Sequence, residues 1–137
     1  MRNNQLILLD ENIKFSELCK TFMKHSEINF KILLDDDNIP EQISWSATEN
    51  PNEGIEETKS IFIGVWDNYN KGLMALPLWT KDMEVFDMKR FYIEVIGSIG
   101  DTLERATGDQ KTAQLIETLC KTMTKDLREE IKAAEKI

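Results

Sequence analysis

Two long apolar stripes with helical spacing, joined by a very short link, constrain the fold of this chain more than any other feature. The first stripe runs through residues 84–107 and the second from residue 110 to about residue 135. Between them, Gly108 is a natural C-terminal stop for one helix and Asp109 is a natural N-cap for the next. Because so short a link makes consecutive helices fold back on each other, the sequence predicts an antiparallel helix hairpin. Its apolar positions are Val85, Met88, Phe91, Tyr92, Val95, Ile96, Ile99 and Leu103, then Ile116, Leu119, Cys120, Met123, Leu127 and Ile131.

Three further residues predict where the first of the two helices begins and where it packs closely against another element. Asp82 precedes it and is placed to cap its N-terminus. Gly97 and Gly100 lie inside it, where glycine lowers helix propensity, so we expect them to mark close packing against another element.

The segment before the helices begins with two runs in which apolar and polar residues alternate, the period of half-buried strands. Residues 27–34 and 42–47 form these runs, and the polar residues 35–38 between them are typical of a turn. The sequence therefore predicts an antiparallel β hairpin. Its inward-facing residues are Ile28, Phe30, Ile32 and Leu34, followed by Ile43, Trp45 and Ala47.

The middle of the chain is expected to add a helix and a third strand. Residues 54–68 carry a helically spaced stripe, and residues 73–79 alternate with Met74, Leu76 and Leu78 on one face. Pro77 lacks an N–H, which places this strand at a sheet edge. The helical stripe consists of Ile55, Thr58, Ile61, Phe62, Val65 and Trp66.

These elements define the expected fold class, α+β. A small antiparallel sheet in the order β-β-α-β is followed by the C-terminal antiparallel helix hairpin, with the helices packed on one face. The predicted core brings together the residues of each stripe, namely Phe30, Trp45, Phe62, Leu76, Phe91, Val95, Leu119 and Met123.

The sequence predicts a single domain over residues 23–137, preceded by an N-terminal extension of residues 1–22. Clear periodicity starts only at Ser26, and Met23 is itself a plausible start. Two interpretations of residues 1–22 remain open: a short docking helix, or an over-extension of the reading frame without order of its own.

Composition and charge exclude several classes of function. The chain has 41% hydrophobic and 31% charged residues, as in ordinary globular domains, and a net charge of −8. Residues 26–60 hold nine Asp or Glu against two Lys, a net of −7, so the acid is concentrated in the first half. This balance argues against a nucleic-acid partner and against binding to an anionic membrane surface. No apolar run approaches the length of a membrane span, so membrane insertion is not expected either.

Cysteine usage and the N-terminus indicate a cytoplasmic protein. Cys19 and Cys120 are far apart and form no CxxC pair, so neither a disulfide framework nor a zinc site is expected. The apolar run of residues 6–9 is too short for a signal peptide.

The residues that most often perform catalysis offer no assembled site. His25, the single histidine, has no fixed partner in sequence and is interpreted as an ordinary surface residue. The acidic residues 35–38 resemble the start of an EF-hand calcium loop. The loop as a whole does not match, because Pro40 stands at the sixth position, where glycine is required, and Ser46 at the twelfth, where glutamate is required. The adjacent Glu56 and Glu57 are interpreted as helix N-terminal charges. We therefore assign no catalytic residue, no cofactor and no metal.

A partner-binding site is the remaining candidate, at the end of the third strand. Trp79 lies on the face opposite to Met74, and Lys81 and Phe86 follow it. In one interpretation Trp79 covers the start of the next helix and completes the core. In the other, Trp79, Lys81 and Phe86 form an exposed anchor for a protein partner.

Several stretches in order give the chain a resemblance to a known family. They are residues 26–35 (SEINFKILLD), 39–47 (IPEQISWSA), 78–83 (LWTKDM), 88–92 (MKRFY) and 101–107 (DTLERAT). Together they are similar to the gliding-motility-associated protein C family (GldC) of Bacteroidetes-type bacteria, over about residues 26–126. Residues 1–22 lie outside the resemblance, and Ala75 and Pro77 stand where polar residues are expected.

The resemblance implies a small accessory protein associated with surface gliding and its linked secretion apparatus, with no catalytic residue to carry over. We therefore expect a non-enzymatic interaction protein, with protein partners whose identity, like the oligomeric state, the sequence leaves open. The alternatives are a chaperone-like adaptor and an enzyme with a carboxylate-based site that forms no motif.

Overall fold

The computed structural model describes residues 24–136, so Cys19 and the predicted extension of residues 1–22 lie outside the described residues. The described chain divides into two compact units, one of residues 24–29 and 46–54 and the other of residues 30–45 and 55–136. Within the smaller unit, the Glu27 backbone N–H donates to Thr48 Oγ1 over 2.9 Å, and the Thr48 N–H donates to the Glu27 carbonyl over 3.0 Å. The single domain over residues 23–137 stays a prediction.

The predicted N-terminal β hairpin is confirmed. Strands β1 (Ile28–Leu34) and β2 (Pro40–Ala47) belong to a three-stranded sheet with the short β3 (Glu56–Thr58), in the order β1-β2-β3. Asp35 holds the turn between β1 and β2, because its Oδ1 accepts the backbone N–H groups of Asp37 over 3.0 Å and Ile39 over 2.9 Å. The run of aspartates is thus a turn built on its own backbone, as expected.

A second antiparallel hairpin follows, formed by β4 (Ser60–Asp67) and β5 (Gly72–Trp79). Its loop is closed by Asp67, whose Oδ1 accepts the backbone N–H groups of Tyr69 over 2.8 Å and Asn70 over 3.2 Å. Lys71 completes the reversal with a φ of 54°. The two strands form a sheet of their own, so the expected single sheet is wrong.

The predicted helix over residues 54–68 is also wrong, because this segment forms β3 and β4. Its stripe consists of adjacent pairs such as Ile61–Phe62 and Val65–Trp66. Adjacent pairs fit a helical stripe, but in a strand they simply point to opposite faces. The β-branched and aromatic run around Gly64 favours the strand, since glycine weakens a helix and these side chains pack well on a sheet.

Pro77 fits the edge position predicted for its strand. The Thr80 backbone N–H donates to the Lys59 carbonyl over 2.8 Å, which fixes which pairs of the ladder are hydrogen-bonded. By alternation, Pro77 and its partner Phe62 form a non-hydrogen-bonded pair. The missing N–H of Pro77 therefore lies on the outer side of β5, where the described sheet has no further strand.

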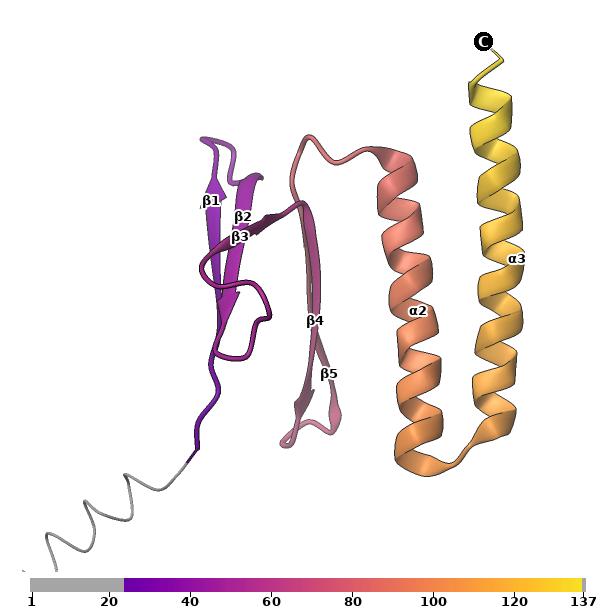
Figure 1. Ribbon diagram of the computed structural model, residues 1–137, viewed down its shortest axis with the longest axis horizontal. Helices are drawn as coiled ribbons and strands as arrows, with labels where there is room; N and C mark the ends of the chain where they lie inside the picture. The colour runs from indigo at the N-terminus through magenta and orange to yellow at the C-terminus, as the bar shows by residue number, and fades with distance from the viewer. Residues whose placement is uncertain (1–23, 137) are drawn as a thin grey trace, which may run out of the picture. The chain divides into compact units, whose positions relative to one another are not determined.

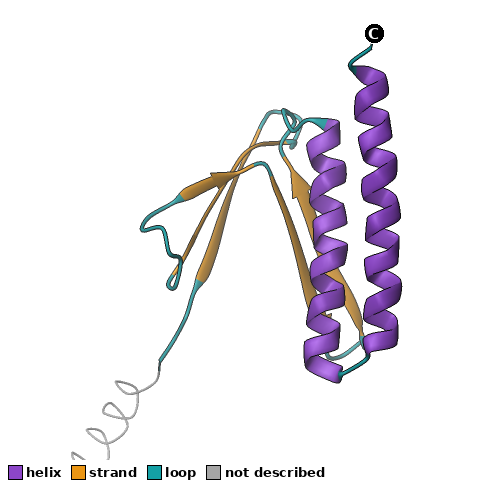
Figure 2. Ribbon diagram, turned by 45° about the vertical axis from the view of Figure 1, so that its right-hand side comes forward, coloured by secondary structure: helices purple, strands orange, loops and turns teal. Residues whose placement is uncertain are grey.

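The predicted helix hairpin is confirmed by α2 (Val85–Thr107) and α3 (Gln110–Ala134), which pack against each other beside the β4–β5 hairpin (Figures 1 and 2). Gly108 ends α2 with a φ of 73°, and its N–H donates to the Glu104 carbonyl over 2.8 Å. Asp109 caps α3, accepting the Thr112 N–H over 3.0 Å. Asp82 does not cap α2, whose N-cap is Glu84, because its carboxylate pairs with Lys59 at 3.0 Å instead.

The two helices approach closely at Gly100. A Cβ at this position would lie only 2.9 Å from Ile116 Cγ2, whereas a Cβ at Gly97 would lie 3.8 Å from Cys120 Sγ. Gly100 thus marks close packing, as predicted. Cys120 faces α2, with its Sγ 3.6 Å from the Ile93 carbonyl oxygen, which confirms its expected packing role. An ion pair between Lys89 and Glu130 also links the helices.

The predicted core is only partly buried. Among the described residues, the buried apolar side chains are Ile43, Ile61 and Leu127, and Trp45 is half-buried against Phe30, with ring centroids 6.5 Å apart. Leu76 and Leu119 are exposed, so the expectation that the eight stripe residues bury one another is wrong. The face of β5 that carries Leu73, not the predicted face of Met74 and Leu76, is the one turned toward α2. Much apolar surface of the β4–β5 hairpin is therefore uncovered.

Candidate functional site

The predicted anchor residues Trp79 and Lys81 meet the β1–β2 turn. Trp79 is 44% exposed at the end of β5. With Pro77 and Leu78 it lines a shallow hollow of about 340 Å³, whose other side is formed by residues 38–40. The Trp79 ring is therefore only partly buried, and it lies beside the turn of residues 38–40.

Lys81 ties the loop after β5 to the first hairpin. Its Nζ lies 2.9 Å from Glu41 Oε1 and 3.3 Å from Asp35 Oδ2, and its backbone N–H donates to the Pro40 carbonyl over 3.1 Å. The hydrogen bond to Glu41, followed by the one to Asp35, raises the pKa of Lys81. The Ile39 backbone N–H, with Lys81 as a further donor, lowers the pKa of Asp35. The ammonium group thus already has two carboxylate partners within the chain.

Phe86 does not join this group. It lies in the first turn of α2, where it is half-buried, and it does not line the hollow beside Trp79. The structure therefore brings two of the three predicted residues to one place and leaves the third on another element.

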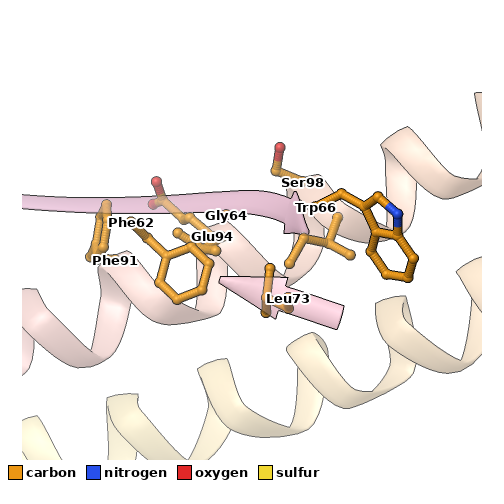
Figure 3. A pocket seen from close by; sticks show the side chains of 9 residues that line it. Phe62, Gly64, Trp66, Leu73, Phe91, Glu94 and Ser98 are labelled. Atoms are coloured by element: carbon orange, nitrogen blue, oxygen red, sulfur yellow. The ribbon is translucent and has the colours of Figure 1, made fainter. Parts of the chain in front are cut away.

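A larger apolar groove lies between the β4–β5 hairpin and α2 (Figure 3). Its volume is about 820 Å³. Figure 3 shows side chains from both strands and from the helix lining it. The strands contribute Phe62, Gly64, Trp66 and Leu73, and α2 contributes Phe91, Glu94, Val95, Ser98 and Ile99.

The residues that line the groove share one face of the β4–β5 hairpin and one face of α2. Phe62, Gly64 and Trp66 alternate along β4, so they share one face, and Leu73 opposite Trp66 extends that face onto β5. Phe91, Val95 and Ile99 repeat at helical spacing on α2. The Phe62 ring meets Tyr92 of α2 edge-on, with centroids 6.4 Å apart.

Gly64 leaves room in the floor of the groove. A Cβ at this position would lie 3.1 Å from Leu73 Cδ1, so any side chain here would push against Leu73. Trp66 and Leu73 remain largely exposed beside it. The floor is therefore open toward the tip of the hairpin.

The chemistry of the groove suits binding. Of the nine residues that line it, Glu94 alone is charged and Ser98 adds one hydroxyl. Within residues 24–136, no group of three or more His, Cys, Asp or Glu side chains is arranged to hold a metal ion. Among the same residues no helix is long and apolar enough to cross a membrane. His25, as expected, is exposed.

The groove was not predicted from the sequence, because the expected helix over residues 54–68 included Phe62 and Trp66. Read as a strand, the alternation of Phe62, Gly64 and Trp66 with Ile61, Ile63 and Val65 would have indicated a sheet that is apolar on both faces. That pattern was the available signal for an uncovered binding surface.

These features define a small α+β protein with an open apolar groove between the β4–β5 hairpin and α2. The chain belongs to the family of gliding motility-associated GldC-like proteins, whose family model matches residues 40–129. The match extends from β2 into α3 and includes every residue that lines the groove. Comparisons with curated proteins and with solved structures found no match. Family membership confirms the predicted resemblance and associates the chain with gliding motility.

Proposed function

We propose that this protein is a non-enzymatic accessory protein of gliding motility, which binds a segment of a partner protein in the groove between the β4–β5 hairpin and α2. The observation that carries the proposal is the lining of the groove, which is apolar except for Glu94 and Ser98. Open apolar grooves of this kind are typical sites for an amphipathic segment of another chain. General acid–base chemistry, by contrast, requires positioned proton donors and acceptors.

The charge of the groove specifies the chemistry of the partner. Glu94 lies on the exposed side of α2, in a chain with a net charge of −8. A segment with an apolar stripe and a lysine or arginine beside it would bury the stripe against Phe91, Val95 and Leu73 and pair its cation with Glu94. We therefore propose an amphipathic helix with a basic flank as the occupant.

Binding of defined peptides tests this assignment. The probe is a helical peptide with leucines at positions i, i+3, i+4 and i+7 and one flanking lysine, and its twin carries glutamate in place of lysine. We expect the lysine peptide to bind about two- to fivefold more tightly, the scale of an exposed ion pair. Glu94→Lys should reverse this preference. Titration followed by calorimetry or by peptide fluorescence measures both affinities.

A matched pair of leucines controls for general surface effects. Leu73 lines the groove and is 65% exposed, and Leu115 on α3 lies outside it and is 64% exposed. Leu73→Ala should weaken peptide binding by about tenfold, as for a central apolar contact, whereas Leu115→Ala should leave it unchanged. Equal effects of the two substitutions would contradict binding in the groove.

A chaperone-like adaptor would use the same groove with less selectivity. It would accept apolar segments of several clients, so the lysine and glutamate peptides would bind alike and Glu94→Lys would change nothing. Loss of the charge preference with retention of the Leu73 effect would therefore favour the adaptor over an accessory protein with one partner.

A further inference from the structure

A further hollow lies between α2 and α3, and we call it the interhelix hollow. Its volume is about 340 Å³. Its apolar lining consists of Leu127, which is buried, and of Ile93 and Ile131, which are half-buried. Two arginines line it as well, Arg90 from α2 and Arg128 from α3, and both are exposed. The hollow therefore has an apolar floor and a rim that carries two positive charges.

Helical spacing places the lining residues on one side of the helix pair. Arg90 lies three residues before Ile93 on α2, and Leu127 lies four residues before Ile131 on α3. Glu94, which follows Ile93, lines both the interhelix hollow and the groove beside the β4–β5 hairpin. The two sites are therefore neighbours on α2, with one carboxylate between them.

The two arginines are only weakly neutralised within the chain. Arg90 Nη1 lies 3.5 Å from Asp87 Oδ1, and both side chains are 59% exposed, so water and salt weaken this contact. Of the ion pairs formed by residues 24–136, none includes Arg128. Among the residues that line the hollow, Glu94 alone is acidic. The hollow thus keeps an excess of positive charge.

Arg128 also belongs to a stripe of basic residues along α3. Lys121, Lys125 and Lys132 lie seven, three and four residues from Arg128, so the four side chains share one face of the helix. Two of these lysines have carboxylate partners on the same helix, Lys121 at 2.6 Å and Lys125 at 4.0 Å. In a chain with a net charge of −8, this side of the helix pair is a local concentration of cations.

We propose that the interhelix hollow binds an acidic segment of a partner protein, in which an apolar side chain enters the hollow and flanking carboxylates pair with Arg90 and Arg128. The guanidinium group is a planar fork of N–H donors that matches the two oxygens of a carboxylate. The apolar floor is filled by an aliphatic side chain, which a glutamate–leucine–glutamate segment supplies and a free phosphate does not. A short segment contacts only the basic side of the chain, whereas an extended anionic membrane is repelled by its net charge.

The interhelix hollow is a site separate from the one proposed in the groove. Glu94 attracts the cation of a segment in the groove and repels an anion in the hollow. Glu94→Gln should therefore abolish the charge preference of peptides in the groove and tighten binding of an acidic peptide in the hollow by about two- to fivefold. Because neither Arg90 nor Arg128 lines the groove, the two proposals can fail separately.

Titration of the full chain with defined peptides, followed by NMR of isotope-labelled protein, tests the proposal. The probe is a peptide with one leucine between two pairs of glutamates and with both ends blocked. One twin carries lysine in place of every glutamate, and the other carries alanine in place of leucine. We expect the probe to shift the amide signals of residues 90–94 and 124–131, and to bind at least about fivefold more tightly than the lysine twin. The alanine twin should bind about threefold more weakly than the probe, because it leaves the floor uncovered.

Substitution of the arginines identifies the groups that bind the carboxylates. Arg90→Gln and Arg128→Gln should each weaken binding of the probe by about two- to fivefold. Arg105→Gln is the matched control, because it removes the same charge from an exposed position of α2 outside the hollow, and it should leave the affinity unchanged. The double substitution Arg90→Glu, Arg128→Glu should make the lysine twin the tighter ligand. Circular dichroism checks that each variant is folded.

Three results would overturn the proposal. Equal affinities for the probe and its lysine twin, or equal weakening by Arg105→Gln and Arg128→Gln, would remove the role of the two arginines. Equal affinities for the probe and its alanine twin, with inorganic phosphate displacing both, would reduce the hollow to a general anion site. Binding to phosphatidylserine vesicles that Arg128→Gln abolishes, without binding of the probe, would assign this surface to a membrane instead of a protein segment.

Discussion

At the scale of single residues, two glycines of α2 show how the space available for a Cβ atom determines the effect of a substitution on stability. Gly97 and Gly100 both face α3, and both lower the intrinsic helix propensity of α2. At Gly97 a Cβ would make an ordinary contact with Cys120, whereas at Gly100 it would overlap Ile116. The same substitution at the two positions should therefore have opposite effects.

We expect Gly97→Ala to stabilise the protein by up to about 1 kcal/mol, the gain in helix propensity. Gly100→Ala should destabilise it by up to about 2 kcal/mol, because the overpacking cost of roughly 1–3 kcal/mol outweighs that gain. Urea unfolding measures both free energies. If Gly100→Ala were stabilising as well, α2 and α3 would not approach at Gly100 as closely as described.

At the scale of elements, the N-terminus of α3 depends on one carboxylate. Asp109 Oδ1 accepts the Thr112 N–H over 3.0 Å, and Oδ2 accepts the Thr112 hydroxyl over 2.6 Å. The hydroxyl bond, followed by the backbone N–H, lowers the pKa of Asp109 below its ordinary value of 3.8. Since the folded state binds this proton less readily than the unfolded chain, the carboxylate stabilises the fold above pH 3.8.

That stabilisation should disappear as the pH falls through the lowered pKa of Asp109. Asp109→Asn keeps an N-cap oxygen but removes the charge. We expect the variant to melt at a lower temperature than the wild type at pH 7, and the two melting temperatures to converge as the pH falls below the lowered pKa of Asp109. Thermal unfolding followed by circular dichroism measures the difference. A constant difference across this range would assign the loss to the shape of the cap and not to its charge.

The elements also show which parts of the fold a sequence can predict. The helix hairpin follows from local signals, because Gly108 and Asp109 act within a few residues of themselves. The β4 strand does not, since Ile61–Phe62 and Val65–Trp66 satisfy a helical stripe and a two-faced strand equally well. Tertiary pairing with β5 decides between them. The groove was missed for the same reason: the alternation along residues 61–66 indicates an apolar sheet face only once the segment is read as a strand, and the pairing of Trp66 with Leu73 comes from the register with β5.

At the scale of the whole molecule, β5 connects the groove to the predicted anchor residue Trp79. Leu73, Ala75, Pro77 and Trp79 lie on one face by the two-residue period, so Leu73 and Trp79 are about 20 Å apart along the strand. Leu73 lines the groove, and Trp79 lines the hollow beside residues 38–40. A partner segment that fills the groove and continues along β5 would reach the Trp79 ring.

The contribution of Trp79 should therefore depend on the length of the partner segment. A helix spans about 20 Å in roughly 13 residues, so a peptide of two helical turns stays within the groove and one of about 20 residues reaches Trp79. We expect Trp79→Ala to weaken binding of the long peptide by about tenfold and to leave the short one unchanged. Calorimetry with both peptides measures this, and Trp66→Ala, which should weaken both, is the matched control. If Trp79→Ala left the affinity of the long peptide unaltered, the partner would contact the groove alone, and Trp79 would be a structural residue that covers the β1–β2 turn.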